Sequence, residues 1–166
     1  MKTASQILML MAIISFMSCG QLHVVTLYVD TKEIKKDNID INNDSLNKYA
    51  HFNQPKGISN KHFTTHVRRG DRIIWDAVSS SNPSDEVKII AINHISGEII
   101  LKRKSPTSQP QSFTTKSGIV KTLFAGTIKK RPVERYTYIQ EIYEIKFTVT
   151  DKEGTFTIDP KIRSYQ

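Results

Sequence analysis

Short runs of β-branched and aromatic residues recur along the chain, and turn-forming residues separate them. Within most runs, apolar and polar positions alternate with the period of two that is typical of β-strands. No stretch of a dozen residues keeps apolar positions at helical spacing, so helix is expected to be scarce. The strands predicted from this pattern span residues 23–29, 72–75, 87–94, 98–102, 118–125, 136–142, 143–149 and 156–158.

This series of short strands predicts an all-β protein. We expect a single antiparallel β-sandwich or barrel of about eight strands with long loops, and an immunoglobulin-like sandwich is one such arrangement. Two polar segments lack the alternation: residues 37–61 are rich in Asn, Asp and Ser, and residues 104–115 contain Pro106 and Pro110. Both are predicted to form long loops, because proline cannot donate to a strand ladder and Asn, Asp and Ser favour turns.

The N-terminus has the pattern of an export signal. Lys2 precedes an apolar run over residues 7–17, which is too short to span a bilayer but has the length of a signal-peptide core. The run is followed by a small residue, a cysteine and a glycine at positions 18–20. This order resembles a bacterial lipobox, in which the thiol, here Cys19, is lipidated and becomes the new N-terminus.

We therefore expect a lipoprotein-type signal peptide over residues 1–18, an anchor segment over 19–22 and a β-sandwich domain over 23–166. Phe16 and Met17 differ from the usual Leu and small residue of a lipobox, so plain cleavage and a retained anchor stay open as alternatives. Because Cys19 is the only cysteine, the domain has no disulfide framework. The expected location is the bacterial cell envelope, as an outer-membrane or periplasm-facing lipoprotein attached to the membrane through its lipid.

Composition agrees with one soluble domain. The chain has 166 residues, of which 38% are hydrophobic and 24% charged. This hydrophobic content is too high for a fully disordered chain, and the mean hydropathy of −0.37 argues against an integral membrane protein.

Basic residues cluster in the later part of the chain, and the formal net charge is +8. Such clusters most often form solvated turns, which is one interpretation here. In the other, they bind the acidic groups of lipopolysaccharide, phospholipid headgroups or uronic-acid glycans, with tyrosines supplying apolar contacts. The candidate residues for an anionic ligand are Lys102, Arg103, Lys104, Lys129, Lys130, Arg131, Arg135, Tyr136 and Tyr138.

Other chemistries lack the residues that they need. The five histidines are dispersed and no thiol follows Cys19, so we expect no metal site and no cofactor. The chain has no G-x-S-x-G elbow and no glycine-rich phosphate loop, so it is not expected to be an enzyme. The export signal argues against a nucleic-acid partner.

Residues 70–75 are assigned a structural role. Gly70 is suited to a turn with positive φ, Asp71 can accept hydrogen bonds from the turn's backbone, and Trp75 is expected in the core between two sheets. A Trp that stacks on a ligand at the rim of the sandwich is the alternative.

Residues 28–34 (YVDTKEI), 67–75 (VRRGDRIIW), 143–147 (YEIKF) and 158–162 (IDPKI) occur in this order. Together they resemble the AidA/PixA-type inclusion body proteins. The resemblance implies a cupredoxin-like β-sandwich without copper, and it supplies no catalytic residue.

Two functions from different classes are consistent with these patterns. The first is a non-enzymatic, lipid-anchored envelope protein that acts as a structural or protein-interaction module. The second is a carbohydrate or anionic-glycan binding module that uses the basic clusters with Tyr136 and Tyr138. A glycan module needs exposed aromatic rings beside the basic residues, whereas an interaction module needs an apolar patch or an open sheet edge.

Overall fold

The computed structural model describes residues 20–35, 47–55, 58–102, 111–114, 120–134 and 137–166. Almost all of the regular structure in these residues is β, and a short 3-10 helix, η3 (Asn60–His62), precedes the third strand. The strands are β1 (Leu22–Val29), β2 (Ala50–His51), β3 (Thr64–Arg68), β4 (Arg72–Ser79), β5 (Val87–Gly97), β6 (Leu101–Lys102), β7 (Gln111–Thr114), β8 (Val120–Ile128), β9 (Tyr138–Val149), β10 (Phe156–Ile158) and β11 (Lys161–Tyr165).

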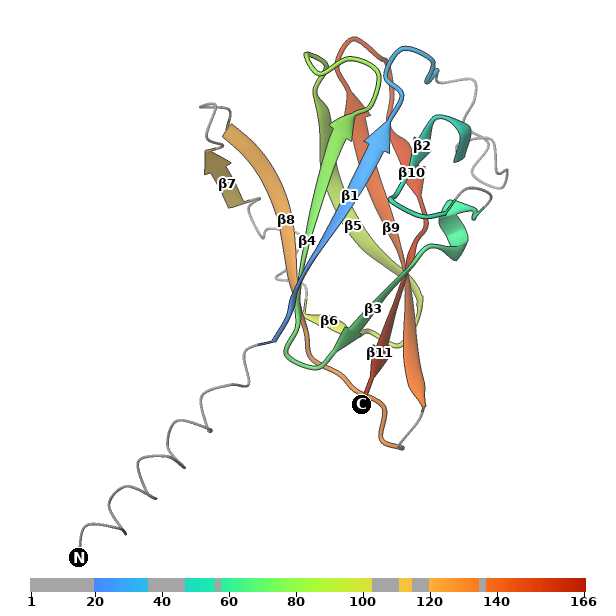
Figure 1. Ribbon diagram of the computed structural model, residues 1–166, viewed down its shortest axis with the longest axis vertical. Helices are drawn as coiled ribbons and strands as arrows, with labels where there is room; N and C mark the ends of the chain where they lie inside the picture. The colour runs from blue at the N-terminus through green and yellow to red at the C-terminus, as the bar shows by residue number, and fades with distance from the viewer. Residues whose placement is uncertain (1–19, 36–46, 56–57, 103–110, 115–119, 135–136) are drawn as a thin grey trace, which may run out of the picture.

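The strands form two sheets that face each other, which confirms the expected β-sandwich (Figure 1). The first sheet has the order β2-β1-β4-β8-β6, with β7 paired to β8. The second has the order β10-β9-β11-β3, with β5 paired to β9. Among the described residues, no helix is long and apolar enough to cross a membrane.

Both sheets are mixed, so the expectation of purely antiparallel sheets is wrong in this detail. β1 pairs with β4 in parallel, and so does β3 with β11. The first parallel pair arises because the chain leaves β1, crosses to the second sheet to form β3, and then returns to the first sheet as β4. Parallel neighbours need such a crossover connection.

Three further details differ from the expected strands. Residues 136–142 and 143–149 were predicted as two strands, but they form the single strand β9, which is long enough to pair with β5, β10 and β11. The predicted loop over 104–115 contains β7, which pairs with β8 directly after Pro110. The strands β2, β3 and β11 were not predicted; β2 lies within the predicted loop over residues 37–61, and β11 directly follows Pro160.

The inward positions of both sheets make one hydrophobic core. Leu27 and Ile73 from the first sheet and Tyr143 and Phe147 from the second are fully buried. Trp75 is 2% exposed and lies in this core, where it was expected. Its neighbours in sequence follow the strand period, since Ile73 is buried with it and Ile74 faces away.

One end of the sandwich, here called the base, collects six strand ends. The register places the start of β1 beside the start of β4, and the end of β8 beside that same start. It also places the end of β11 between the end of β3 and the start of β9. Figure 1 shows the C-terminus close to this end.

Candidate ligand-binding site at the base of the sandwich

The turn between β3 and β4 is fixed by one carboxylate. Gly70 has φ +95°, a conformation that glycine adopts without strain. The next residue, Asp71, accepts hydrogen bonds from the backbone N–H groups of Gln21 and Arg68, both at 2.8 Å. Its Oδ2 also lies 2.9 Å from Nε2 of His23. Asp71 therefore ties the start of β1 to the β3–β4 turn.

These contacts set the charge of Asp71. Burial raises the pKa of Asp71, but the hydrogen bonds from Arg68, His23 and Gln21 outweigh it, so the net pKa lies below its usual value. The carboxylate is thus ionised at neutral pH, and both of its oxygens accept hydrogen bonds from the protein itself. The side chains of Arg68 and Arg69 on the same turn point to solvent.

A cleft of about 770 Å³ opens beside this turn. It lies between the start of the first strand of one sheet and the ends of β3 and β11 in the other. Two imidazoles, two guanidinium groups, a phenol and the Asp71 carboxylate line it. Because the Asp71 oxygens already accept hydrogen bonds from Gln21 and Arg68, the remaining donors suit an anionic, hydrogen-bonding ligand. The residues of the lining are Gly20, Gln21, His23, Tyr165 and residues 66–71.

Three basic clusters that are far apart in sequence meet around the cleft and the base. Backbone hydrogen bonds join the β3–β4 turn to the end of β8, from Gly70 N–H to the Ile128 carbonyl and from Ile128 N–H to the Asp71 carbonyl. Lys102 lies opposite Thr127 on one side of β8, and Arg72 lies opposite the same residue on the other side. We call the exposed cations gathered here the basic rim: Arg68, Arg69, Arg72, Lys102, Lys129, Lys130 and Arg131.

The segment after β8 is held against the end of β11. Ser164 Oγ donates to the Lys130 carbonyl at 2.8 Å, and Gln166 Nε2 donates to the Val133 carbonyl at 3.3 Å. One rim cation has an acidic partner, since Lys130 Nζ lies 3.0 Å from Glu98 in an exposed ion pair. Among the described residues, the seven rim cations outnumber the exposed carboxylates of Glu98 and Glu134, so the base has a net positive charge.

An aromatic and basic surface adjoins the rim on the outer face of the second sheet. Tyr138 is 49% exposed, and its ring centroid lies 5.9 Å from that of Tyr165. Tyr165 in turn stacks on His66 and is hydrogen-bonded to it at 3.0 Å. The Arg163 guanidinium lies over the Tyr138 ring at 4.6 Å, and its Nε donates to Gln140 at 2.8 Å.

We call these five side chains the aromatic row. They come from neighbouring strands in register, with Tyr165 opposite Tyr138 and Arg163 opposite both His66 and Gln140. The arrangement holds Arg163 and the rings in place before any ligand arrives, which lowers the entropic cost of binding.

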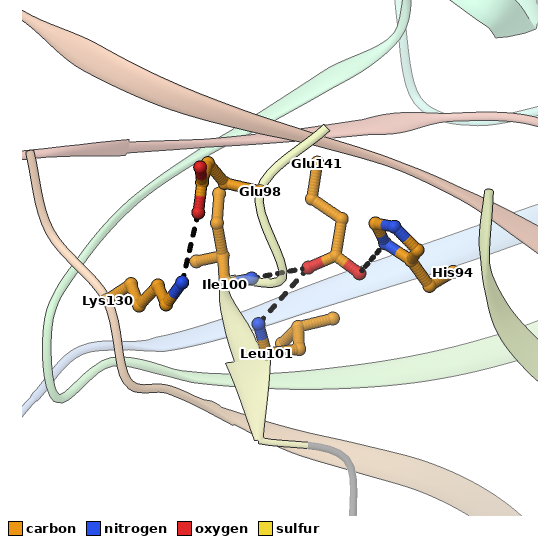
Figure 2. Close-up of polar contacts among 6 residues, drawn as sticks. All are labelled: His94, Glu98, Ile100, Leu101, Lys130 and Glu141. Atoms are coloured by element: carbon orange, nitrogen blue, oxygen red, sulfur yellow. Dashed lines mark hydrogen bonds and ion pairs between the residues drawn. The ribbon is translucent and has the colours of Figure 1, made fainter. Parts of the chain in front are cut away.

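A second buried carboxylate organises the other side of the base (Figure 2). Glu141 is fully buried, and it accepts the backbone N–H groups of Ile100 at 2.8 Å and Leu101 at 3.2 Å. Its other oxygen lies 3.1 Å from Nδ1 of His94. Glu141 thereby fixes the crossover that leads into β6, which carries Lys102.

Sequence reasoning found some of these residues and missed others. Lys102, Lys129, Lys130, Arg131 and Tyr138 lie at the base as a group, whereas Cys19, Arg103, Lys104, Arg135 and Tyr136 lie outside the described residues. Sequence reasoning did not select His23, His66, Glu141, Arg163 or Tyr165 for this site. A charged residue at an inward position of the β9 alternation was the one available signal for Glu141.

The described residues contain no group of three or more His, Cys, Asp or Glu side chains placed to hold a metal ion. The two His–carboxylate pairs at the base, His23–Asp71 and His94–Glu141, each contain only two such groups. In both pairs the carboxylate also accepts two backbone hydrogen bonds, so each carboxylate holds the local backbone in place.

Comparison with known proteins gives one family match. Residues 22–154 match the family described as a domain of unknown function, DUF8788. The match runs from the start of β1 to the turn before β10. No curated protein matches the chain.

Proposed function

The chain belongs to the DUF8788 family, whose description states no function, and from the geometry of the base we propose a non-enzymatic, exported and lipid-anchored binding domain for an anionic glycan of the bacterial cell envelope. The aromatic row beside the basic rim is the observation that carries this proposal. It provides the combination that a glycan module needs, exposed aromatic rings beside cations.

The lipid anchor is supported by the order of the N-terminal elements. The apolar run over residues 7–17 is followed by Cys19, and β1 begins at Leu22. Cleavage before Cys19 would thus leave the sandwich almost directly on the lipidated residue. Such a chain stays at the envelope without a membrane-spanning helix.

The aromatic row has the chemistry for a sugar that carries carboxylate or phosphate. Among the described residues, the Arg163 side chain donates a hydrogen bond from Nε to Gln140, which leaves the N–H groups at the end of the guanidinium for an acidic group of the ligand. The exposed part of Tyr138 offers an apolar ring surface with a polar hydroxyl, which suits the alternating CH and OH groups of a sugar. The cleft, which His66 and Tyr165 also line, adjoins this surface on the side of the base.

A protein partner is the second candidate. Leu22 and Val24 are 52% and 62% exposed, and both lie on β1. Apolar residues exposed on a strand at the surface are a feature of protein contacts. Among the described residues, no fixed set of hydrogen bonds and ring contacts like that of the aromatic row surrounds Leu22 and Val24, which is why we place the glycan first.

Titration calorimetry of the purified chain with a uronic-acid oligosaccharide tests the proposal, with a neutral oligosaccharide of the same length as the reference. We expect binding of the acidic oligosaccharide only, weakened about tenfold or more by Tyr138→Ala and by Arg163→Gln. Lys48→Gln is the matched control, because Lys48 also lies over a tyrosine ring, that of Tyr49, away from the base. Equal affinity for both oligosaccharides, or an equal effect of Lys48→Gln, would contradict the proposal.

A further inference from the structure

The chain enters the sandwich at the end that carries the basic rim. Gly20 packs directly on the β3–β4 turn, since a Cβ atom at Gly20 would come within 2.0 Å of the Gly70 carbonyl oxygen. The next residue, Gln21, donates its backbone N–H to Asp71 at 2.8 Å. The backbone is therefore fixed to the base from residue 20 onward.

This fixed point leaves almost no tether after the proposed anchor. Cys19 directly precedes Gly20, and consecutive Cα atoms lie only about 3.8 Å apart. A lipid on Cys19 would therefore hold the Gly70 turn within a few ångströms of the headgroups. The base could not turn away from the membrane without breaking the contacts of Gly20 and Gln21.

The part of the molecule brought to the membrane in this way is strongly cationic. The rim cations are exposed, and among them Lys130 has the exposed acidic partner Glu98. Val133, at 96% exposed the most exposed large apolar residue described, lies on the same segment as Lys130 and Arg131. Basic residues around an exposed apolar side chain are typical of surfaces that bind anionic bilayers.

We propose that the base docks on a bilayer of anionic phospholipid, with the basic rim on the lipid phosphates and Val133 entering the headgroup layer. This inference rests on the proposed lipid anchor. In the docked position the opposite end of the sandwich, where β1 and β4 end, points away from the membrane. The aromatic row lies on an outer sheet face, so it stays open at the side to a glycan.

Lysine accessibility tests the docking on the full chain as a bacterial host produces it. Intact mass first shows whether the chain carries lipid. The protein is then reconstituted into vesicles of phosphatidylcholine alone or with about 30% phosphatidylglycerol. A membrane-impermeant amine reagent labels the lysines, and peptide mass spectrometry gives the rate at each position. Lys129 and Lys130 report on the base, and Lys32 and Lys35 report on the part of the chain that follows the far end of β1.

We expect labelling of Lys129 and Lys130 to slow about fivefold or more when phosphatidylglycerol is present, and to recover in about 0.5 M NaCl. Lys32 and Lys35 should label at the same rate in both vesicles. The variant Arg68→Gln/Arg69→Gln/Arg72→Gln should lose the protection. The control Lys48→Gln/Lys88→Gln/Lys152→Gln, which removes three charges elsewhere, should keep it.

The outcomes separate this inference from the proposed anchor. A lipidated chain whose base lysines label equally in both vesicles overturns the docking and leaves the anchor intact. A chain without lipid overturns the anchor. The same labelling, with vesicles added at low salt, then measures whether the basic rim alone binds the anionic bilayer. Protection of Lys32 equal to that of Lys129 would also overturn the docking, because it would show that both ends of the sandwich contact the bilayer and that the base is not the docking surface.

Discussion

The indole Nε1–H of Trp75 donates a hydrogen bond to the Tyr143 hydroxyl at 3.0 Å, and this bond joins the two sheets of the sandwich. Trp75 belongs to β4 in the first sheet and Tyr143 to β9 in the second, and both side chains are buried. Their rings meet edge to face with centroids 5.8 Å apart. The pair therefore combines apolar burial, aromatic contact and a satisfied polar group in one inter-sheet contact.

Truncation of this pair should cost much of the domain's stability. Trp75→Ala is expected to lower the free energy of unfolding by about 3–5 kcal/mol, because it removes apolar burial and leaves a cavity. Tyr143→Phe should cost about 1–3 kcal/mol, since it leaves the buried indole N–H without its hydroxyl acceptor. Urea denaturation followed by circular dichroism measures both.

The matched control for this prediction is the basic rim. Lys129→Gln and Lys130→Gln should stay within about 0.5 kcal/mol of wild type, because these side chains are exposed. A Trp75→Ala protein as stable as wild type would contradict the core position of the indole.

The sequence could predict the sandwich but not how its ends are assembled. Strand period gave β1, β4, β5 and β10 to within a few residues, because each buries alternate apolar side chains and this is a local property. The parallel partners β3 and β11 are set by a crossover between sheets, which no local pattern records. The turn at Gly70 and Asp71 was predictable, because positive φ and a carboxylate that accepts backbone N–H groups are local requirements.

The candidate site illustrates the same limit. Each basic cluster was visible in the sequence as a run of letters, but their meeting depends on the pairing of β8 with both β4 and β6. Arg163 and Tyr165 were not selected for the site, because they lie on a short strand whose register against β9 brings them to Tyr138. That register is a tertiary property.

Glu141, which is buried, should be more important for stability than Glu98, an exposed carboxylate at the base. Glu141→Gln replaces an acceptor-only carboxylate by an amide, which cannot accept all three hydrogen bonds from Ile100, Leu101 and His94. We expect a loss of about 1–3 kcal/mol, measured by chemical denaturation, because one buried donor is left without its acceptor. Glu98→Gln, which breaks an exposed ion pair with Lys130, should cost less than about 1 kcal/mol. Similar costs for the two variants would show that the Glu141 contacts contribute little.

Lipidation is tested by metabolic labelling with a clickable fatty acid. Wild type should incorporate the label and Cys19→Ala should not, because Cys19 is the only cysteine and the position at which the lipobox-like order ends. If both proteins are labelled equally, or neither is, the chain is not anchored through Cys19.

The pH dependence of stability should depend on Asp71. Its folded-state pKa is lowered below the ordinary value of 3.8, because the hydrogen bonds from Arg68, His23 and Gln21 outweigh burial. The unfolded state therefore binds protons more readily, and Asp71 contributes stability that is complete above about pH 3.8 and is lost as the pH falls through the folded-state pKa. Asp71→Asn should cost about 1–3 kcal/mol at pH 7, and the difference from wild type should narrow at more acidic pH.

Asp159 supplies the control of opposite sign for this prediction. Burial, with a smaller effect of the Glu144 charge, raises the pKa of Asp159. Its ionised form is therefore disfavoured in the folded state, and the folded protein gains relative stability as the pH falls and Asp159 takes up a proton. Asp159→Asn should be no less stable than wild type at pH 7, and this advantage should disappear in acid. Thermal melts of wild type and the two variants between about pH 7 and about pH 2 measure both trends, because the Asp71 contribution is lost below its ordinary pKa of 3.8. Parallel curves for Asp71→Asn and wild type over this range would show that Asp71 does not tie β1 to the β3–β4 turn through its charge.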